Sequence, residues 1–167
     1  MPTAATPPAS PAIDELARVL RELAAVHRDI AANFEQQHEA MRRFDTEAMQ
    51  RLGRRQEASH RRVLRLEANR GTAAGRAARA AQLPIDVPLL ALADAYPAQR
   101  DELLRLRQEL RAVAAEAQER SRRCQRIAGS VLTHLNGAVR LLTRSSLYGR
   151  GGAFVSPPQL RSLDSVG

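Results

Sequence analysis

The chain has 167 residues and a formal net charge of +8, and alanine and arginine dominate its composition. It has 30 alanines and no tryptophan, and its tyrosines and phenylalanines total only five. Such a composition favours helices but supplies little of the bulky apolar material that a deep globular core needs. It fits a helical bundle with thin Ala/Leu seams and argues against an α/β enzyme.

All 26 basic residues are arginine, and the positive charge is concentrated near the C-terminus. Residues 1–119 carry 18 arginines against 17 acids, whereas residues 120–167 carry eight arginines against Asp164 alone. Selection for bidentate phosphate or carboxylate contacts is one interpretation of the choice of arginine, and a bias toward GC-rich codons is the favoured one. The sequence leaves open whether the basic C-terminal region is functional. An acidic partner surface and a tail that only aids solubility both account for the excess.

The sequence contains no sign of a membrane span, a signal peptide or a disulfide. No run approaches the roughly 18 apolar residues of a spanning helix, and the start lacks the charged and apolar regions of a signal peptide. Cys124 is the one cysteine, so we expect a small buried thiol. The cytoplasm is the expected location.

The N-terminal half predicts an arm followed by two helices. Residues 1–12 are uncharged and rich in alanine and proline, which is typical of a disordered arm. Apolar residues then alternate at spacings of three and four over 13–44, with His27 and Gln37 as interruptions. At Asp45 the phase slips by one residue, which predicts a helix break with Asp45 as the N-cap.

The second predicted helix is weaker than the first. It covers 46–70 with a weak extension to 81, and its seam contains Gln56 and Ser59. Gly71 and Gly75 each cost about 1 kcal/mol relative to alanine, so we expect fraying beyond residue 70. Prolines then bound a short apolar helix at 87–95 and begin a long last helix at 97–145.

The last helix carries an apolar seam that runs from Leu103 to Leu141, interrupted by Arg120 and His134. At 1.5 Å per residue this seam is roughly 58 Å long, too long for one side of a compact enzyme core. The predicted fold class is therefore all-α, with long antiparallel helices forming a coiled-coil-like bundle over 13–145. Residues 146–167 are predicted to be a flexible tail.

Near the end of this helix a second apolar stripe lies beside the first. It adds surface that a coiled-coil seam does not need, and Gly129 and Gly137 loosen the helix at the same place. Such a surface suits an amphipathic partner helix, and a loosened segment can order on binding and release later. The candidate binding residues are Val131, Leu132, Leu135, Val139 and Leu142.

No catalytic, cofactor or metal site is indicated by the sequence. The four histidines lie far apart without cysteine or carboxylate partners at ligand spacing, and we interpret His27 and His134 as polar interruptions of helix seams. Gly149, Gly151 and Gly152 lack the strand and helix that surround a phosphate-binding loop. We expect no enzyme activity and no cofactor.

The order of these parts resembles the FlgN-like flagellar export chaperones over about residues 13–152. The family's acidic break after the first long helix is matched by Arg42–Met49, and its short leucine-rich helix by Leu89–Pro97. Its Asn-Gly and leucine run is matched by Leu135–Leu142, and its Tyr-Gly turn by Leu147–Gly149. Where the family often has Pro-Asp-Gly after the tyrosine, this chain has Arg150-Gly151-Gly152.

The resemblance implies a cytoplasmic chaperone that binds the terminal helical regions of secreted flagellar hook-filament junction proteins and presents them to the type III export gate. It implies the five candidate residues as the client contact, with Tyr148 as a contact for the gate or the client. Tyr148 as a simple cover for the helix end is the alternative. We expect a monomer or a weak dimer.

Two other classes compete with this interpretation. A nucleic-acid-associated coiled coil is suggested by the isoelectric point of 11.3 and the arginine clusters, but the aromatic side chains that stack on bases are nearly absent. A self-assembling structural coiled coil is the other class, and the break at Asp45 favours a folded-back bundle over it. We expect no specific nucleic acid binding, and the sequence does not identify the client.

Overall fold

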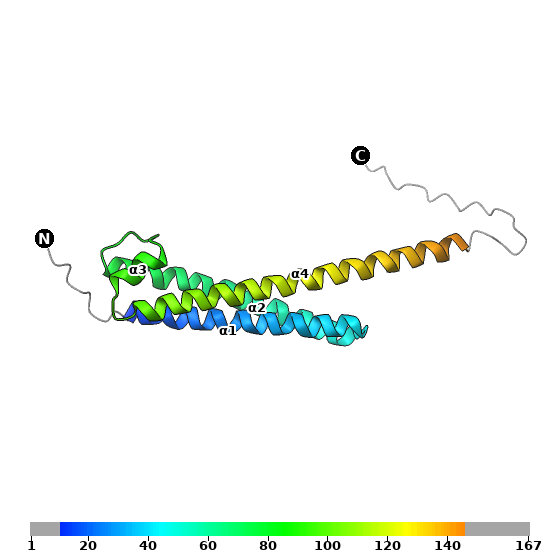
Figure 1. Ribbon diagram of the computed structural model, residues 1–167, viewed down its shortest axis with the longest axis horizontal. Helices are drawn as coiled ribbons and strands as arrows, with labels where there is room; N and C mark the ends of the chain where they lie inside the picture. Colours follow the sequence, from blue (N-terminus) through cyan, green and yellow to red (C-terminus); the bar gives the residue numbers. More distant parts are fainter. Residues whose placement is uncertain (1–10, 146–167) are drawn as a thin grey trace, which may run out of the picture. The chain divides into compact units, whose positions relative to one another are not determined.

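The computed structural model describes the backbone of residues 11–145 and the side chains of residues 11–140 (Figure 1). Within this range the chain forms four helices and no strand, so the predicted all-α fold is confirmed. The helices are α1 (Pro11–Arg42), α2 (Thr46–Ala80), α3 (Leu89–Ala95) and α4 (Arg100–Ser145). Residues 1–10 of the predicted arm and the predicted tail 146–167 lie outside the described residues.

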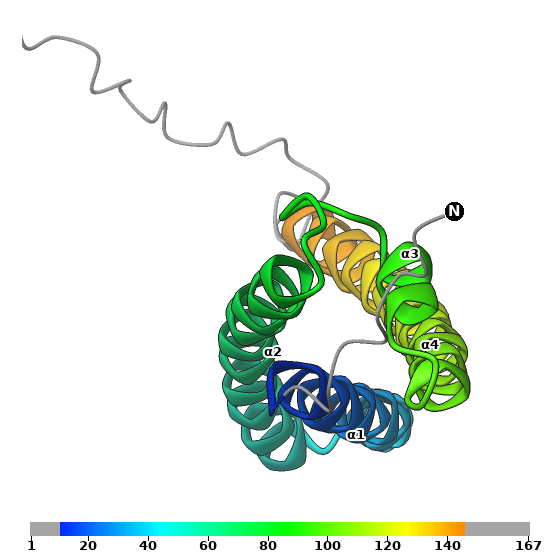
Figure 2. The ribbon, with the colours of Figure 1, turned by 90° about the vertical axis from the view of Figure 1, so that its left-hand side faces the viewer.

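The chain divides into two units, residues 1–125 and 126–167, where the sequence predicts one bundle over 13–145. In the first unit the three long helices pack along a shared core, as the end-on view of Figure 2 shows. Arg21 pairs with Glu102 and Arg28 with Glu109, so α4 runs parallel to α1. α2 returns from the end of α1 and is antiparallel to both.

The turn between α1 and α2 is built from a left-handed residue and an N-cap. Phe44 has a φ of 55°, and the Asp45 amide donates to the Ala40 carbonyl oxygen at 3.0 Å, which ends α1. The Asp45 carboxylate accepts a 2.8 Å hydrogen bond from the Ala48 amide at the start of α2. This agrees with the N-cap predicted at Asp45.

α2 stays helical to Ala80, which lies within the predicted weak extension to residue 81. The helix continues to Ala80 because its last turns pack closely into the core, where Ala73, Ala77 and Ala78 are fully buried. Gly75 is part of this close packing, since a Cβ there would lie 3.2 Å from Ile85 Cγ2. Tertiary burial outweighs the low helix propensity of the glycines.

α3 closes the core at the end of the first unit where α1 begins. Its Leu92 and Ala93, and Tyr96 just after it, are at most 1% exposed. The Tyr96 hydroxyl donates to the Ala77 carbonyl oxygen at 2.8 Å, which ties the segment to α2. This short helix therefore covers apolar surface that the three long helices leave open at that end.

A buried amide joins α1 and α2 near their turn. Asn33 is 1% exposed, and its Nδ2 donates to the Leu52 carbonyl oxygen at 3.0 Å and to Gln56 Oε1 at 2.7 Å. In the sequence, Gln56 is a polar residue that interrupts the apolar series of the second helix. In the structure this residue pairs with Asn33, and the pair sets the register between the two helices.

Candidate functional site

Residues 126–145, the described part of the second unit, form the end of α4 and carry an exposed apolar stripe. Leu132, Leu135 and Val139 are 60%, 56% and 56% exposed. Successive residues of a helix are rotated by roughly 100°, so these three side chains fall within an arc of roughly 60°. They form a continuous apolar line along about two turns.

The remaining candidate residues border or extend this line. Val131 is half-buried, and Leu142 belongs to α4 in the part where side chains are not described. Tyr148 lies outside the described residues. The structure thus brings Leu132, Leu135 and Val139 together on one face, with Val131 at its edge.

The segment also carries polar side chains. Thr133 Oγ1 donates to the Gly129 carbonyl oxygen at 2.9 Å, and His134 Nδ1 lies 2.7 Å from the Ser130 carbonyl oxygen, so both side chains turn back onto their own helix. Residues 126–145 contain three arginines and no acidic residue. The segment is an amphipathic, basic helix whose apolar side faces solvent.

The predicted seam of α4 is buried only in its first part. Leu103, Leu106, Ala117 and Cys124 are at most 4% exposed, whereas Ala138 is exposed. Ala138 belongs to the predicted seam, so burial does not extend along the whole of it. In the first unit the seam packs against α1. This helix has 32 residues and ends at Arg42, and α4 has 46 residues.

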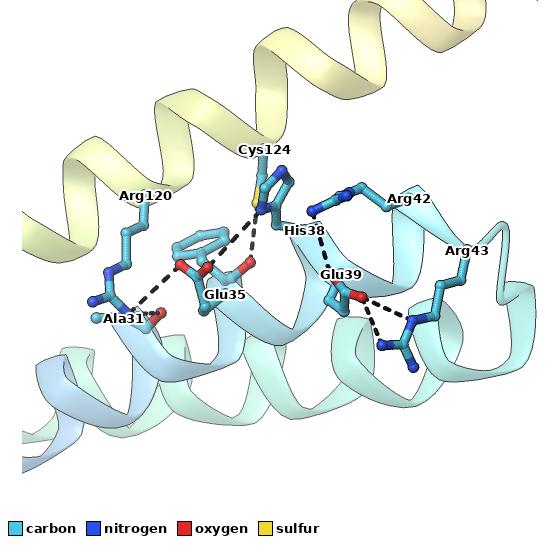
Figure 3. Close-up of polar contacts among 9 residues, drawn as sticks. Ala31, Glu35, His38, Glu39, Arg42, Arg43, Arg120 and Cys124 are labelled. Carbon is cyan, nitrogen blue, oxygen red and sulfur yellow. Dashed lines mark hydrogen bonds and ion pairs between the residues drawn. The ribbon is translucent and has the colours of Figure 1, made fainter.

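Two contacts of α4 with α1 in the first unit are polar bonds to backbone carbonyl groups (Figure 3). Arg120 Nη1 donates to the Ala31 carbonyl oxygen at 3.2 Å, and its Nη2 lies 2.6 Å from Glu116 Oε1. The Cys124 thiol donates to the Phe34 carbonyl oxygen at 3.2 Å. In the sequence Arg120 interrupts the apolar seam. In the structure its guanidinium group hydrogen-bonds α4 to α1.

Cys124 is a structural thiol, as predicted. It is 4% exposed and unpaired. Burial raises the pKa of the Cys124 thiol above its usual value, and the nearby Glu35 carboxylate adds to this effect. The group therefore stays protonated, acts as a hydrogen-bond donor and is a poor nucleophile.

A groove that the sequence analysis missed lies between the three long helices of the first unit. It has a volume of about 310 Å³. His27, Ile30 and Phe34 come from α1, and His60 and Val63 from α2; the α4 side is lined by Ala114, Ala117, Gln118 and Ser121. Periodicity identifies the apolar face of each helix but not which helices share a groove, so no sequence signal marks this feature.

His27 lines this groove. Burial lowers the pKa of His27, and the neighbouring His60 contributes in the same direction, against Glu67. No cluster of three or more His, Cys, Asp or Glu side chains suited to a metal ion occurs within residues 11–140.

Among the described helices, none has the length and apolar character to cross a bilayer.

Together these features define a helical protein in which a packed bundle and an exposed, basic, apolar-striped helix end occur in one chain. The family model for the FlgN protein matches residues 1–153, and the chain belongs to the FlgN family. Membership of this family of chaperones supports a role in flagellar protein export. Searches of curated proteins and of solved structures gave no significant match.

Proposed function

We propose that the protein is a cytoplasmic export chaperone for flagellar hook-associated proteins. Val131, Leu132, Leu135, Val139 and Leu142 bind the terminal helical regions of the client, and the complex is presented to the flagellar type III secretion apparatus. The observation that supports this proposal is the exposure of Leu132, Leu135 and Val139 on one face of the helix end. Family membership supports the chaperone class.

The exposed stripe suits reversible capture of an amphipathic helix. Burial of each exposed leucine contributes about 1.5–3 kcal/mol, and a client helix with apolar residues at spacings of three and four matches the line of Leu132, Leu135 and Val139. Gly129 and Gly137 lower the helix propensity of the segment. The ordering entropy that this introduces reduces the net affinity and favours later release.

The test is a titration of the purified chain with the isolated terminal helices of a hook-associated protein. We expect Leu132→Asp combined with Leu135→Asp to weaken binding by about a hundredfold or more, because two buried leucine contacts are replaced by buried charges. Phe44→Asp with Leu90→Asp is the matched control: it also places two acids at exposed apolar positions, which are 70% and 48% exposed. We expect the control to keep its affinity.

Circular dichroism of both double variants shows whether helicity is retained. Loss of affinity in the control to the same extent would show a general charge effect and would contradict the proposal. Full affinity in the Leu132 and Leu135 variant would also exclude the stripe as the client site.

Tyr148 is proposed as a contact for the export gate or the client. Truncation after Ser146 is expected to leave client affinity within about tenfold, a difference of about 1.4 kcal/mol, and to impair motility in cells. Tyr148→Ala is likewise expected to keep client affinity and to impair motility, but the loss of motility should be smaller. If truncation changes neither property, the tyrosine has no role in either step.

The protein is proposed to act as a monomer or a weak dimer. Within the described residues of the first unit, the apolar seams of the long helices are covered by each other and by α3. Sedimentation equilibrium with and without the client peptide measures the stoichiometry directly. A stable dimer at low concentration would favour the self-assembling alternative.

A further inference from the structure

α2 is strongly basic, as are residues 120–167. It contains nine arginines and three glutamates, a net charge of +6, against +8 for the whole chain. Six of these arginines lie within 15 consecutive residues, and all six are exposed. We call them the arginine strip: Arg51, Arg54, Arg55, Arg61, Arg62 and Arg65.

The arginine strip occupies one face of the helix. At roughly 100° per residue its six members fall within an arc of roughly 120°, and at 1.5 Å per residue they extend over about 21 Å. The face of α2 beside the strip is packed into the bundle, where Leu66 and Ala73 are buried. α2 lies on one side of the bundle in Figure 2, so its outer face is available to a partner.

The charge of the strip is not neutralised within the described part of the chain. Arg51 pairs with Glu47 at 2.9 Å, and the other five arginines make no side-chain hydrogen bond or ion pair with any residue of 11–140. Some arginines elsewhere in the first unit have an acidic partner, as Arg28 does with Glu109. Like charges at spacings of three and four destabilise a helix, so an anionic surface placed on the strip relieves this repulsion.

The side chains among the arginines indicate the chemistry of the partner. Leu64, between Arg61 and Arg65, is 71% exposed, the highest value among the large apolar side chains of residues 11–140. Ala58 and Ala68 are exposed on the same side and are small enough to let a second backbone approach. A basic face with an apolar anchor beside one edge and small neighbours fits a protein helix that carries acidic residues next to a leucine.

Two other kinds of anionic partner fit this surface less well. α2 contains no aromatic residue to stack on nucleic acid bases. A bilayer surface binds helices that insert an apolar face beneath their basic one, and the apolar face of α2 is already buried in the bundle.

We propose that the arginine strip of α2 is a second docking surface, which binds an acidic amphipathic helix of a protein partner. It lies on α2, whereas the proposed client site is on the end of α4. The two surfaces differ in chemistry, since the first is dominated by charge and the second by apolar contact. The proposal does not depend on the client assignment, and either can fail alone.

The probe is a synthetic helical peptide with glutamates at spacings of three and four and one central leucine, compared with a scrambled peptide of the same composition. Fluorescence anisotropy measures its affinity for the full chain at about 50 and 200 mM salt. We expect the ordered peptide to bind about tenfold more tightly than the scrambled one, because only the ordered peptide aligns its acids with the strip. Equal affinities would overturn the proposal.

The main variant carries Arg54→Glu, Arg61→Glu and Arg65→Glu. We expect it to lose at least about tenfold in affinity, since three attractive pairs become repulsive. The control carries Arg107→Glu, Arg111→Glu and Arg122→Glu at exposed positions of α4, which changes the net charge by the same amount. It is expected to lose less than about threefold; an equal loss would mean that only net charge matters and would overturn the proposal.

Further variants separate folding effects and other partners. If the main variant loses helicity by circular dichroism, Arg54→Gln, Arg61→Gln and Arg65→Gln replace it, and we expect at least about a threefold loss of peptide affinity.

Leu64→Ala is expected to weaken peptide binding by about tenfold, because the apolar anchor is lost. Unchanged binding of Leu64→Ala, or strip-dependent binding of duplex DNA or anionic vesicles that is tighter than peptide binding, would overturn the assignment to a protein helix.

Discussion

The two parts of α4 contain the same kinds of apolar residue in opposite environments. Leu103 and Leu106 are at most 1% exposed in the first unit, whereas Leu132 and Leu135 are 60% and 56% exposed in the second. Both pairs are leucines at a helical spacing of three, so side-chain type and periodicity do not distinguish them. The difference shows that an apolar stripe becomes core or binding surface according to whether another element covers it.

The largest expected effect tests this contrast directly. Leu106→Asp is expected to lower the free energy of unfolding by about 3–5 kcal/mol, because it leaves an uncompensated charge in the core. Leu135→Asp is expected to change it by less than about 0.5 kcal/mol, as is usual for an exposed position. Thermal and urea denaturation measure both values. Equal destabilisation by the two substitutions would mean that the end of α4 is also core.

A smaller effect is expected at the buried amide of α1. Asn33→Ala removes the donor to Gln56 and to the Leu52 carbonyl oxygen, and we expect a loss of about 1–3 kcal/mol. Asn69→Ala, at an exposed position of α2, is the control and is expected to be nearly neutral. A double-mutant cycle with Gln56→Ala measures the coupling, and zero coupling would show that the pair does not set the helix register.

Substitution of glycine by alanine is expected to change stability in opposite directions in the two units. No atom lies within 4 Å of a Cβ placed on Gly129 or Gly137, so alanine at each is expected to stabilise the helix end locally by about 1 kcal/mol. Hydrogen exchange should slow within residues 126–145 without a change in the melting temperature of the bundle. Gly75→Ala should instead lower that temperature, since its Cβ meets Ile85 Cγ2 at 3.2 Å. Stabilisation by all three substitutions would contradict the contrast.

The smallest expected effect concerns the groove. The pKa of His27 is lowered by burial, so the folded protein favours its neutral form. Stability is therefore fully present above the ordinary value of about 6.5 and is lost as the pH falls through that value toward the lowered pKa. His27→Gln is expected to remove part of this loss between about pH 7.5 and 5.5, as measured by urea denaturation. A pH dependence of stability that is unchanged in His27→Gln would remove His27 as the cause.

Most of the secondary structure was predictable because local chemistry sets it. The apolar alternation of α1, the capping carboxylate of Asp45 and the prolines around α3 act within a few residues of the chain. The all-α class follows from these signals together with the alanine-rich composition. The chaperone class was predictable from the order of several short motifs, and the family match over residues 1–153 agrees with it.

Helix propensity alone did not indicate that α2 continues well beyond residue 70. The penalty of Gly75 is a local property, whereas the burial of Ala73 and Ala77 against other helices and the Tyr96 bond to Ala77 are contacts between distant parts of the chain. Asn33 was missed for the same reason. A polar residue beside a seam is unremarkable until Gln56, 23 residues away, is known to lie opposite it.

The sequence by itself determined where helices form, which face of each is apolar, and the excess apolar stripe that marks the candidate client site. These properties depend on residues three or four positions apart, which the chain brings together as soon as it is helical. Only the tertiary structure decided which stripe is covered, which arginines lack a counter-charge and how far each seam is buried. Those properties depend on which residues distant in sequence become neighbours, and helical periodicity carries no information about that choice.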